Sequence, residues 1–485
     1  MGSDPQYAKY PLLPLAQHIF TLTNPAASKL AQQTSIKSLQ DAITEHKMAP
    51  FYRYLAHPSE GILNASGVST SHAEKPLGRK PSATGLVASR TSIPKVDLQW
   101  DETLYERLKK ENDEELEGFK KEEEEAAEKA GDTEVQAARG KRAEFWARVG
   151  DKDRAIAAYE EVFEKTGVLG TKIDLVLAII RIGLFYGDKL LVKKHIERAK
   201  TLVESGGDWD RRNRLKAYQG LYLLTVRSYS LAAPLLLDSL STFTSYELCT
   251  YSSLVVYSVL AGSVSLKRVD FKSKVVDAPE IKAILGDGEE KLMALSGAIS
   301  AGPGADEEMV DMTTPTAAKT AVNLTTLGSD QPEAESAIDF SPLAELVSSL
   351  YTGSYRSFFG ALAAVEVNFL GQDRYLYEHR GWFVREMRLR AYQQLLQSYR
   401  VVGLENMAND FGVTVDFLDR DLAKFIAAGR IPCTIDRVTG KGIIETNRPD
   451  DKNKQYNDVV KQGDQLITKL QKYGQAVRLR GSERA

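Results

Sequence analysis

The sequence predicts a mainly α-helical chain: a right-handed, tetratricopeptide-like solenoid of helical hairpins, then a winged-helix domain and a C-terminal helix. Three patterns predict this order. A turn motif recurs through the middle of the chain, a helix–helix–helix–hairpin pattern follows it, and the last segment carries a heptad repeat. With 485 residues, 43% of them hydrophobic and 27% charged, the chain is long enough for several cores.

The turn motif in the middle of the chain predicts the solenoid. Gly150–Asp151, Gly187–Asp188 and Arg227 precede apolar residues at the same offsets. Their starting points lie about 37 and about 40 residues apart, close to the period of about 34 residues that is typical of tetratricopeptide hairpins. Such hairpins bury their apolar faces by stacking. The apolar residues at these offsets are Ala155, Tyr159, Val192, Ile196, Ala232 and Leu236.

Composition divides the rest of the chain. A single charged helix is expected over Asp101–Arg139, and stretches rich in Gly, Ser, Thr or acidic residues are expected to be flexible. The predicted segments are an N-terminal helical element (1–56), a flexible loop (57–100), the charged helix with the repeats (101–285), a disordered insertion (286–340), the last solenoid helices (341–383), a winged helix (384–447), and a spacer with the C-terminal helix (448–485).

Three short helices are expected in the winged-helix domain: Val384–Arg400, Leu404–Phe411 and one capped by Thr414. Gly412 and Gly429 suit the left-handed positions that follow helix ends. The first helix and the third helix should each bury one apolar face. These faces comprise Met387, Ala391, Leu395, Leu396 and Tyr399 on the first helix, and Leu418, Leu422, Phe425 and Ile426 on the third.

Two β-rich runs complete the winged-helix pattern. Ile431–Asp436 and Gly442–Thr446 flank a turn at Arg437–Gly440 and predict a hairpin. A free strand edge exposes unpaired backbone groups, so we expect this edge or its neighbouring helix to dock a partner. The candidate docking residues of the hairpin are Ile431, Ile435, Ile443 and Ile444.

Charge argues against nucleic-acid binding. A DNA-binding winged helix reads bases with Lys, Arg, Asn or Gln on its third helix. Here that helix carries three aspartates against two basic residues, and the formal net charge of the chain is −3. We therefore favour protein–protein docking, with a nucleic-acid-associated protein as an alternative. The charged residues of the third helix are Asp416, Asp419, Asp421, Arg420 and Lys424.

The last segment has the alternating three- and four-residue spacing of a heptad seam. Asn447–Lys454, which contains Pro449, is expected to be an extended spacer in front of it. A helix folded back on its own domain would explain the seam as well. We favour a helix that joins a bundle with helices of other chains. The seam residues are Tyr456, Val459, Gly463, Leu466, Leu470, Tyr473 and Val477, and all except Gly463 are candidate interaction residues.

Motifs for catalysis, cofactors and metals are absent from the sequence. The six histidines are scattered, and His-Glu-x-x-His, Cys-x-x-Cys, Walker and Gly-x-Ser-x-Gly patterns do not occur. His379 and Tyr375–Tyr377 are expected to be core or interface aromatics. The two cysteines, Cys249 and Cys433, predict a reducing compartment. No signal peptide or membrane span is expected. Because the motifs named above are missing, no enzyme, cofactor or metal site is predicted.

Five stretches carry a family resemblance: Gly206–Lys216, Phe243–Leu248, Val384–Arg388, Ile426–Arg430 and Glu445–Asp450. They resemble the PCI-containing non-ATPase subunits of the proteasome regulatory particle lid. The resemblance implies a scaffold subunit of a hetero-oligomer in cytoplasm and nucleus. Its implied partners are other PCI-domain lid subunits, the lid deubiquitinase subunits and the proteasomal ATPase ring. The first subunit of the COP9 signalosome is the nearest alternative.

Overall fold

The chain is mainly helical, and the predicted fold class is confirmed. It divides into two compact units: unit 1 comprises Met1–Thr352 and Gly360–Met387, and unit 2 comprises Gly353–Phe359 and Arg388–Ala485. The computed structural model describes residues 6–58, 61–63, 86, 98–129, 131–286, 339–437, 442–446 and 451–482. Most of the loop predicted over 57–100 and nearly all of the insertion predicted over 286–340 lie outside these described residues.

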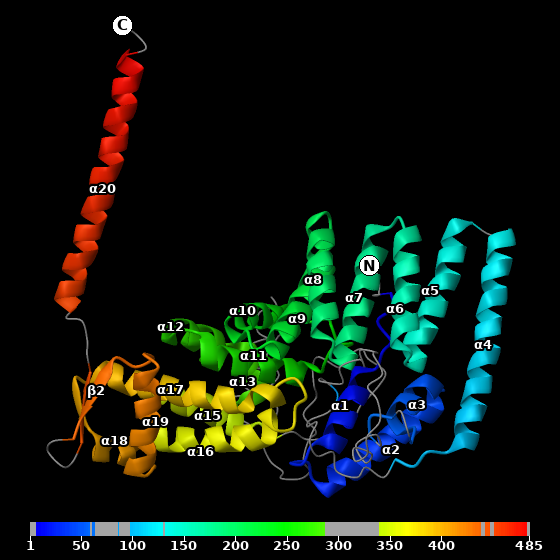
Figure 1. Cartoon of the computed structure of the whole chain (residues 1–485), viewed down its shortest axis with the longest axis horizontal. Coiled ribbons are helices and arrows are strands. Elements are labelled where there is room, and N and C mark those ends of the chain that lie inside the picture. Colours follow the sequence, from blue (N-terminus) through cyan, green and yellow to red (C-terminus); the bar gives the residue numbers. More distant parts are fainter. Residues whose placement is uncertain are drawn as a thin grey trace, which may run out of the picture. The chain divides into compact units, whose positions relative to one another are not determined.

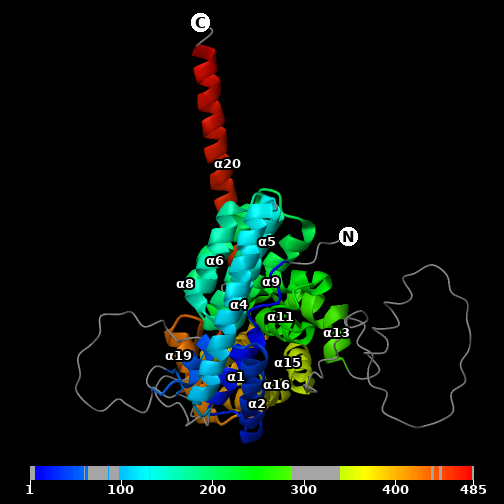
Figure 2. The same ribbon diagram turned by 90° about the vertical axis from the view of Figure 1, so that its right-hand side faces the viewer.

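Consecutive helices of unit 1 pack against each other, and α4 to α8 run side by side (Figure 1). Figure 2 shows α11, α13 and α15 together on one side of the unit. The helices are α1 Leu13–Thr23, α2 Lys29–Glu45, α3 Ala49–Ala56, α4 Glu102–Lys129, α5 Asp132–Val149, α6 Lys152–Lys165, α7 Leu169–Tyr186, α8 Lys189–Glu204, α9 Trp209–Thr225, α10 Tyr229–Ser239, α11 Tyr251–Ser265, α12 Arg268–Phe271, α13 Pro279–Leu285 and α15 Ser341–Thr352.

Four short helical turns and two longer helices complete the connections. The turns are η2 Leu240–Thr242, η3 Lys272–Val276, η4 Glu366–Leu370 and η5 Tyr377–His379. Helices α16 Tyr355–Val365 and α17 Arg380–Ser398 each belong partly to unit 1 and partly to unit 2.

The charged segment forms two helices, so the prediction of one helix over Asp101–Arg139 was wrong. Helix α4 ends at Lys129, and α5 begins after Gly131 and continues to Val149. The two helices pair through Glu123, whose carboxylate accepts hydrogen bonds from Arg139 (2.6 Å) and Arg142 (2.7 Å). Charged side chains of this segment thus hold its two helices together.

The three predicted repeat turns share one backbone geometry, which confirms the repeat. Gly150, Gly187 and Arg227 all have positive φ angles, of 82°, 71° and 63°. The residue after each donates its backbone N–H to a carbonyl five residues back, the bond that closes a helix at a left-handed residue. These bonds join Asp151 to Trp146 (3.1 Å), Asp188 to Gly183 (2.8 Å) and Ser228 to Leu223 (2.8 Å).

The residues predicted to face the interior of the hairpins are buried. Their exposed fractions do not exceed 3%, and Tyr159, Ala232 and Leu236 are fully buried. Helix α7 is buried on all sides from Ile173 to Tyr186, as expected for a central helix that has neighbours all round. The core of unit 1 therefore runs along the inner faces of the stacked hairpins.

Unit 2 contains the winged helix and the C-terminal helix. Its sheet has the antiparallel strand order β1-β3-β2, and Ile444 of β3 lies between Val402 and Ile435. Strand β1 was not predicted. The described elements, after the end of α17, are β1 Val401–Gly403, α18 Leu404–Phe411, α19 Val415–Ala427, β2 Cys433–Asp436, β3 Ile443–Thr446 and α20 Asp451–Ser482.

Helix boundaries in the winged helix match the predicted caps. The Thr414 hydroxyl accepts a hydrogen bond from the Phe417 backbone N–H (3.3 Å), and Gly412 and Gly429 have φ angles of 66° and 67°. One prediction fails at the end of α17. The helix stops at Ser398, and Tyr399 is 57% exposed instead of lying on the buried face.

An aromatic cluster explains why Gly353–Phe359 belongs to unit 2. The ring of Tyr355 stacks on Phe411 with centroids 4.6 Å apart, and Phe359 contacts the same ring at 5.2 Å. Tyr392 of α17 contacts Phe411 at 5.1 Å. Such aromatic pairs add to the stability gained from burial alone. The start of α16 therefore packs with the winged helix, although the sequence places it in the predicted segment 341–383.

Candidate protein-interaction surfaces

A buried ion pair joins α7 to α9. The Arg211 guanidinium donates two hydrogen bonds to the Asp174 carboxylate, with Nε–Oδ1 and Nη2–Oδ2 distances of 2.9 and 2.7 Å. Asp174 is 2% exposed. A bidentate pair fixes both side chains in position. These charges therefore hold two helices together and are not available to a substrate.

Arg181 of α7 extends the network. Its Nη1 donates to the Tyr218 hydroxyl (2.7 Å), and its Nη2 donates to the Tyr7 carbonyl. The Tyr218 hydroxyl donates to Glu247 (3.0 Å), which also accepts from Arg214 (3.2 Å). Burial raises the pKa of Tyr218, so the phenol stays neutral. The network ties the N-terminal segment to α7, α9 and the connection that follows α10.

The segment 371–379 contacts several helices of unit 1. The Asp373 carboxylate accepts hydrogen bonds from the Tyr257 hydroxyl (2.5 Å) and the Tyr375 backbone N–H (2.7 Å). Burial raises the pKa of Asp373. His379 Nε2 lies 2.9 Å from the Thr225 carbonyl oxygen. His379 and Tyr375 thus serve packing and helix connection, in line with the expectation for these residues.

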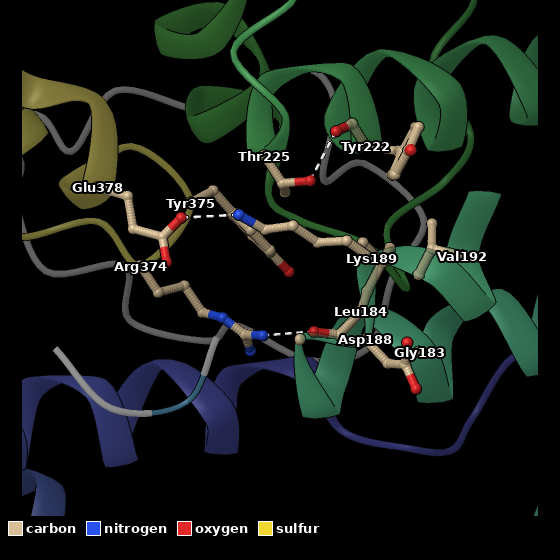
Figure 3. Close-up of a pocket in the computed structure, with 11 residues that line it drawn as sticks. Gly183, Leu184, Asp188, Lys189, Val192, Tyr222, Thr225, Arg374, Tyr375 and Glu378 are labelled. Carbon is tan, nitrogen blue, oxygen red and sulfur yellow. Dashed lines mark hydrogen bonds and ion pairs between the residues drawn. The ribbon is translucent and has the colours of Figure 1, made fainter. Parts of the chain in front are cut away.

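A small cavity lies beside this segment (Figure 3). Across it, Lys189 forms an ion pair with Glu378 at 2.7 Å, and Arg374 donates hydrogen bonds to the carbonyls of Leu184 and Phe185. Its volume is about 30 Å³. Small-molecule sites usually enclose about 300–1,000 Å³, so this cavity has room for water-sized groups only.

Reactive groups and metal ligands do not assemble in the described part of the chain. Burial raises the pKa of the Cys249 thiol to about 12, which leaves it protonated and a poor nucleophile. Within the described ranges, no three His, Cys, Asp or Glu side chains are close enough to hold a metal ion. None of the helices described here has the length and apolar character needed to cross a bilayer.

The third helix of the winged helix, α19, uses one of its aspartates internally. Asp421 is 6% exposed, accepts a hydrogen bond from the Tyr392 hydroxyl (3.2 Å) and forms an ion pair with Arg388 (3.5 Å). Asp421 was expected on an acidic outer face, and that expectation was wrong because its partners lie on α17. Asp416 remains exposed, and Asp419 pairs with Arg437. Even with Asp421 buried, α19 lacks the basic surface with which the recognition helix of a winged helix binds DNA.

The four isoleucines of the hairpin have different environments. Ile431 is 3% exposed and Ile444 is fully buried, so both belong to the core of unit 2. Ile435 and Ile443 are half-buried. Among the described strands, β3 pairs on both sides, so the outer edges of the sheet belong to β1 and β2. Docking through the sheet would therefore use these outer strands. The sequence analysis did not show this constraint, because it did not predict β1.

Helix α20 exposes the six candidate residues of its predicted seam, whereas Gly463 is half-buried. The six candidate residues are at least 61% exposed. Val460 and Ile467 are also exposed (60% and 55%) and were not included in the seam. Both follow a seam residue directly and occupy heptad position e, a signal that was present in the sequence. Apolar residues at a, d and e make a stripe wider than a two-stranded coiled coil needs. The exposed fractions are Tyr456 69%, Val459 65%, Leu466 61%, Leu470 65%, Tyr473 72% and Val477 69%.

Three family models match this chain. The model described as 26S proteasome subunit RPN7 matches residues 101–274, and the PCI domain matches residues 365–448. The model of the RPN7/PSMD6 C-terminal helix matches residues 455–477, which lie within α20. The matches therefore cover the stacked hairpins, the winged helix and the exposed helix.

Proteins of several organisms are similar to this chain over nearly their whole length. The 26S proteasome regulatory subunit rpn7 of Schizosaccharomyces pombe is 38% identical over 470 residues, which cover 97% of each chain. RPN7 of Saccharomyces cerevisiae is 36% identical over 482 residues (99% and 96%). The 26S proteasome non-ATPase regulatory subunit 6 of Dictyostelium discoideum is 34% identical over 479 residues (98% and 99%). This chain therefore belongs to the RPN7/PSMD6 family of 26S proteasome regulatory subunits.

Proposed function

We infer that this chain is a non-catalytic structural subunit of the proteasome regulatory particle lid and acts in ubiquitin-dependent protein degradation. The observation that carries this function is the similarity to 26S regulatory subunits along nearly the whole chain, including the C-terminal helix. The buried charges described above are engaged in structural contacts, which fits a scaffold.

The partners we propose are other PCI-domain lid subunits, the lid deubiquitinase subunits and the proteasomal ATPase ring, in cytoplasm and nucleus. Two surfaces support docking to the lid subunits. One is the winged helix, with its outer strands β1 and β2. The other is the apolar stripe of α20. The first subunit of the COP9 signalosome is disfavoured as an alternative, because the similar proteins are 26S subunits.

The stripe of α20 has enough apolar surface to drive assembly. A lone helix is marginal in water, since nucleation is unfavourable and packing supplies most of its stability. Burying Leu466, Ile467 and Leu470 in a bundle would contribute about 1.5–3 kcal/mol for each side chain. The loss of all three therefore removes a large part of the free energy of docking.

Truncation after Arg448 tests this function. We expect the truncated chain to keep the thermal melting of the solenoid and winged helix, because the stripe of α20 contributes no buried residues to either. We also expect it to be absent from affinity-purified lid. Proteasomal ATPases should co-purify with the intact chain, whereas cullin-associated signalosome subunits would indicate the other complex.

A pair of matched variants locates the effect on the apolar stripe. Replacing Leu466, Ile467 and Leu470 together with alanine should reduce recovery in the lid as strongly as truncation does. Replacing Lys461, Asp464 and Lys472 with alanine should leave recovery unchanged, since these residues lie outside the stripe. Normal assembly of the truncated chain would contradict the proposal, and unfolding of the winged helix on truncation would place α20 in the subunit's own core.

A further inference from the structure

The segment in front of α1 contacts three helices of the solenoid through Tyr7. The Tyr7 ring lies edge-on to the Tyr159 ring of α6, with centroids 5.8 Å apart, and the Tyr7 carbonyl accepts a hydrogen bond from Arg181 of α7. Gly140 of α5 faces the same ring, since a Cβ atom there would lie 2.8 Å from Tyr7 Cε1. We call Gly140, Tyr159 and Arg181 the strap site.

The residues that follow alternate between contact and exposure. Lys9 is exposed, whereas Tyr10 is 8% exposed and Pro11 is buried. The Tyr10 ring contacts the ring of His46, which follows α2, with centroids 5.6 Å apart. Residues 7–11 therefore hold on to unit 1 at both ends, and the side chain in the middle points away from it.

Side chains and one guanidinium hold this segment, and the backbone contributes little. Among the described residues, no backbone–backbone hydrogen bond involves residues 6–11. Tyr7 has a φ angle of 61°, in a region that few non-glycine residues adopt. Such a conformation persists where the surrounding contacts fix it. The segment thus depends on the strap site for its order, as a bound peptide depends on its receptor.

The strap site is held by other contacts as well. Arg181 Nη1 donates a hydrogen bond to the Tyr218 hydroxyl (2.7 Å), and an ion pair between Arg142 and Glu161 (3.0 Å) joins α5 to α6. A hollow of about 640 Å³, lined in part by Tyr7, adjoins the segment. When the segment leaves, water from this hollow can take the place of its carbonyl at Arg181. The site therefore does not need its occupant in order to form.

We propose that residues 7–11 are a detachable strap and that the strap site is a peptide-binding site occupied by the chain's own segment. The site selects an aromatic side chain that fits beside Gly140 and Tyr159 and a carbonyl that faces Arg181. Tyr-Pro three residues later supplies the second anchor. This inference goes beyond the proposed function and does not rest on it, because none of these residues lies in the winged helix or α20.

Gly140→Ala tests whether the strap detaches. The new methyl group takes the place of the Tyr7 ring, while α5 keeps its fold because alanine suits a helix better than glycine. We expect endoproteinase Lys-C to release the fragment 1–9 from this full-length variant at least fivefold faster than from the unaltered chain, as measured by mass spectrometry. Gly118→Ala is the matched control, because a Cβ atom there meets nothing within 4 Å.

The control should release the fragment at the unaltered rate, and both variants should keep cooperative thermal melting. Equal release from the two variants would overturn the proposal. Loss of cooperative melting in Gly140→Ala alone would overturn it too, because the segment would then be part of the core of unit 1.

Binding of the strap as a separate peptide tests the site itself. The probe is the fluorescein-labelled peptide Gln-Tyr-Ala-Lys-Tyr-Pro-Leu, the sequence of residues 6–12. The receptor is the full-length chain with Tyr7→Ala and Tyr10→Ala, whose own segment has lost both anchoring rings. By fluorescence anisotropy, we expect this variant to bind the peptide at least tenfold more tightly than the unaltered chain does, since the unaltered strap occupies its site.

A matched peptide with alanine in place of its first tyrosine should bind the variant at least fivefold more weakly. Equal affinity of the variant and the unaltered chain for the first peptide would overturn the proposal, as would equal affinity of the variant for the two peptides. Loss of cooperative melting in the variant would again place the segment in the core. Both tests use the isolated chain, so failure of the α20 variants to affect assembly would count against the proposed function alone.

Discussion

Arg211 and Arg212 are neighbours in the chain, but the structure places them in opposite environments. Arg211 is buried against Asp174, whereas Arg212 is exposed and donates a hydrogen bond to the Gly207 carbonyl (3.0 Å). Removing one partner of a buried pair leaves the other charge without compensation. The same substitution at the two positions therefore separates the cost of a buried charge from the cost of losing an arginine.

Arg211→Ala should lower the free energy of unfolding of unit 1 by about 3–5 kcal/mol, because Asp174 would stay buried without its partner. Arg212→Ala should change it by less than about 0.5 kcal/mol, as is usual for exposed positions. Thermal melting of the full-length chain, followed by circular dichroism, measures both. Equal shifts in Tm for the two variants would show that the Arg211–Asp174 pair does not hold α7 to α9.

At the scale of an element, strand β1 turns the predicted two-stranded hairpin into a three-stranded sheet. The sequence indicates a two-stranded hairpin with a free edge on each strand. In the structure Val401–Gly403 pairs with β3, so Ile444 lies in the middle strand and is fully buried. Val401, on the outer strand, is 54% exposed. The inner and outer strands should therefore respond differently to substitution.

Ile444→Ala should destabilise the winged helix by about 2–5 kcal/mol, because it leaves a cavity in the core of unit 2. Val401→Ala should cost less than about 1 kcal/mol, since the residue lies on an exposed outer strand. Hydrogen exchange of peptides that cover Cys433–Asp436 reports on this sheet directly. Faster exchange in the Val401 variant than in the Ile444 variant would contradict the strand order.

On the scale of the whole molecule, unit 1 depends on contacts between segments far apart in the chain. The Asn24 side chain donates to the Gly371 carbonyl (2.7 Å), and Arg374 binds carbonyls at the end of α7. The segment that follows η4 thus joins the N-terminal helices to the middle of the solenoid. The predicted insertion separates that segment from the repeats in sequence, and the fold brings them together.

Arg374→Ala should lower the free energy of unfolding of unit 1 by about 1.5–3 kcal/mol, the usual contribution of hydrogen bonds from a charged group. Glu378→Ala is the matched control in the same segment. Its ion pair with Lys189 is partly exposed, so its loss should cost at most about 1 kcal/mol. Limited proteolysis should show earlier cleavage near 371–379 in the Arg374 variant, and equal cleavage in both variants would contradict this role.

The sequence by itself determined the features that depend on local hydrogen bonds and periodicity. The turns at Gly150 and Gly187, the Thr414 cap and the a/d seam of α20 each follow from a few consecutive residues. A left-handed turn residue, a capping hydroxyl or a heptad favours the same local structure wherever it occurs. These signals were sufficient to predict the repeat, the winged helix and an exposed C-terminal helix.

Only the tertiary structure decided which polar and apolar side chains are buried. Asp421 carries a charge and was placed on the surface, but Arg388 and Tyr392 lie beside it in the fold. Ile444 was a candidate for docking until β1 covered its second side. Burial depends on partners that are distant in sequence, and periodicity along one element does not identify those partners. The physical reason is that a charge or an apolar group takes its stability from the groups around it.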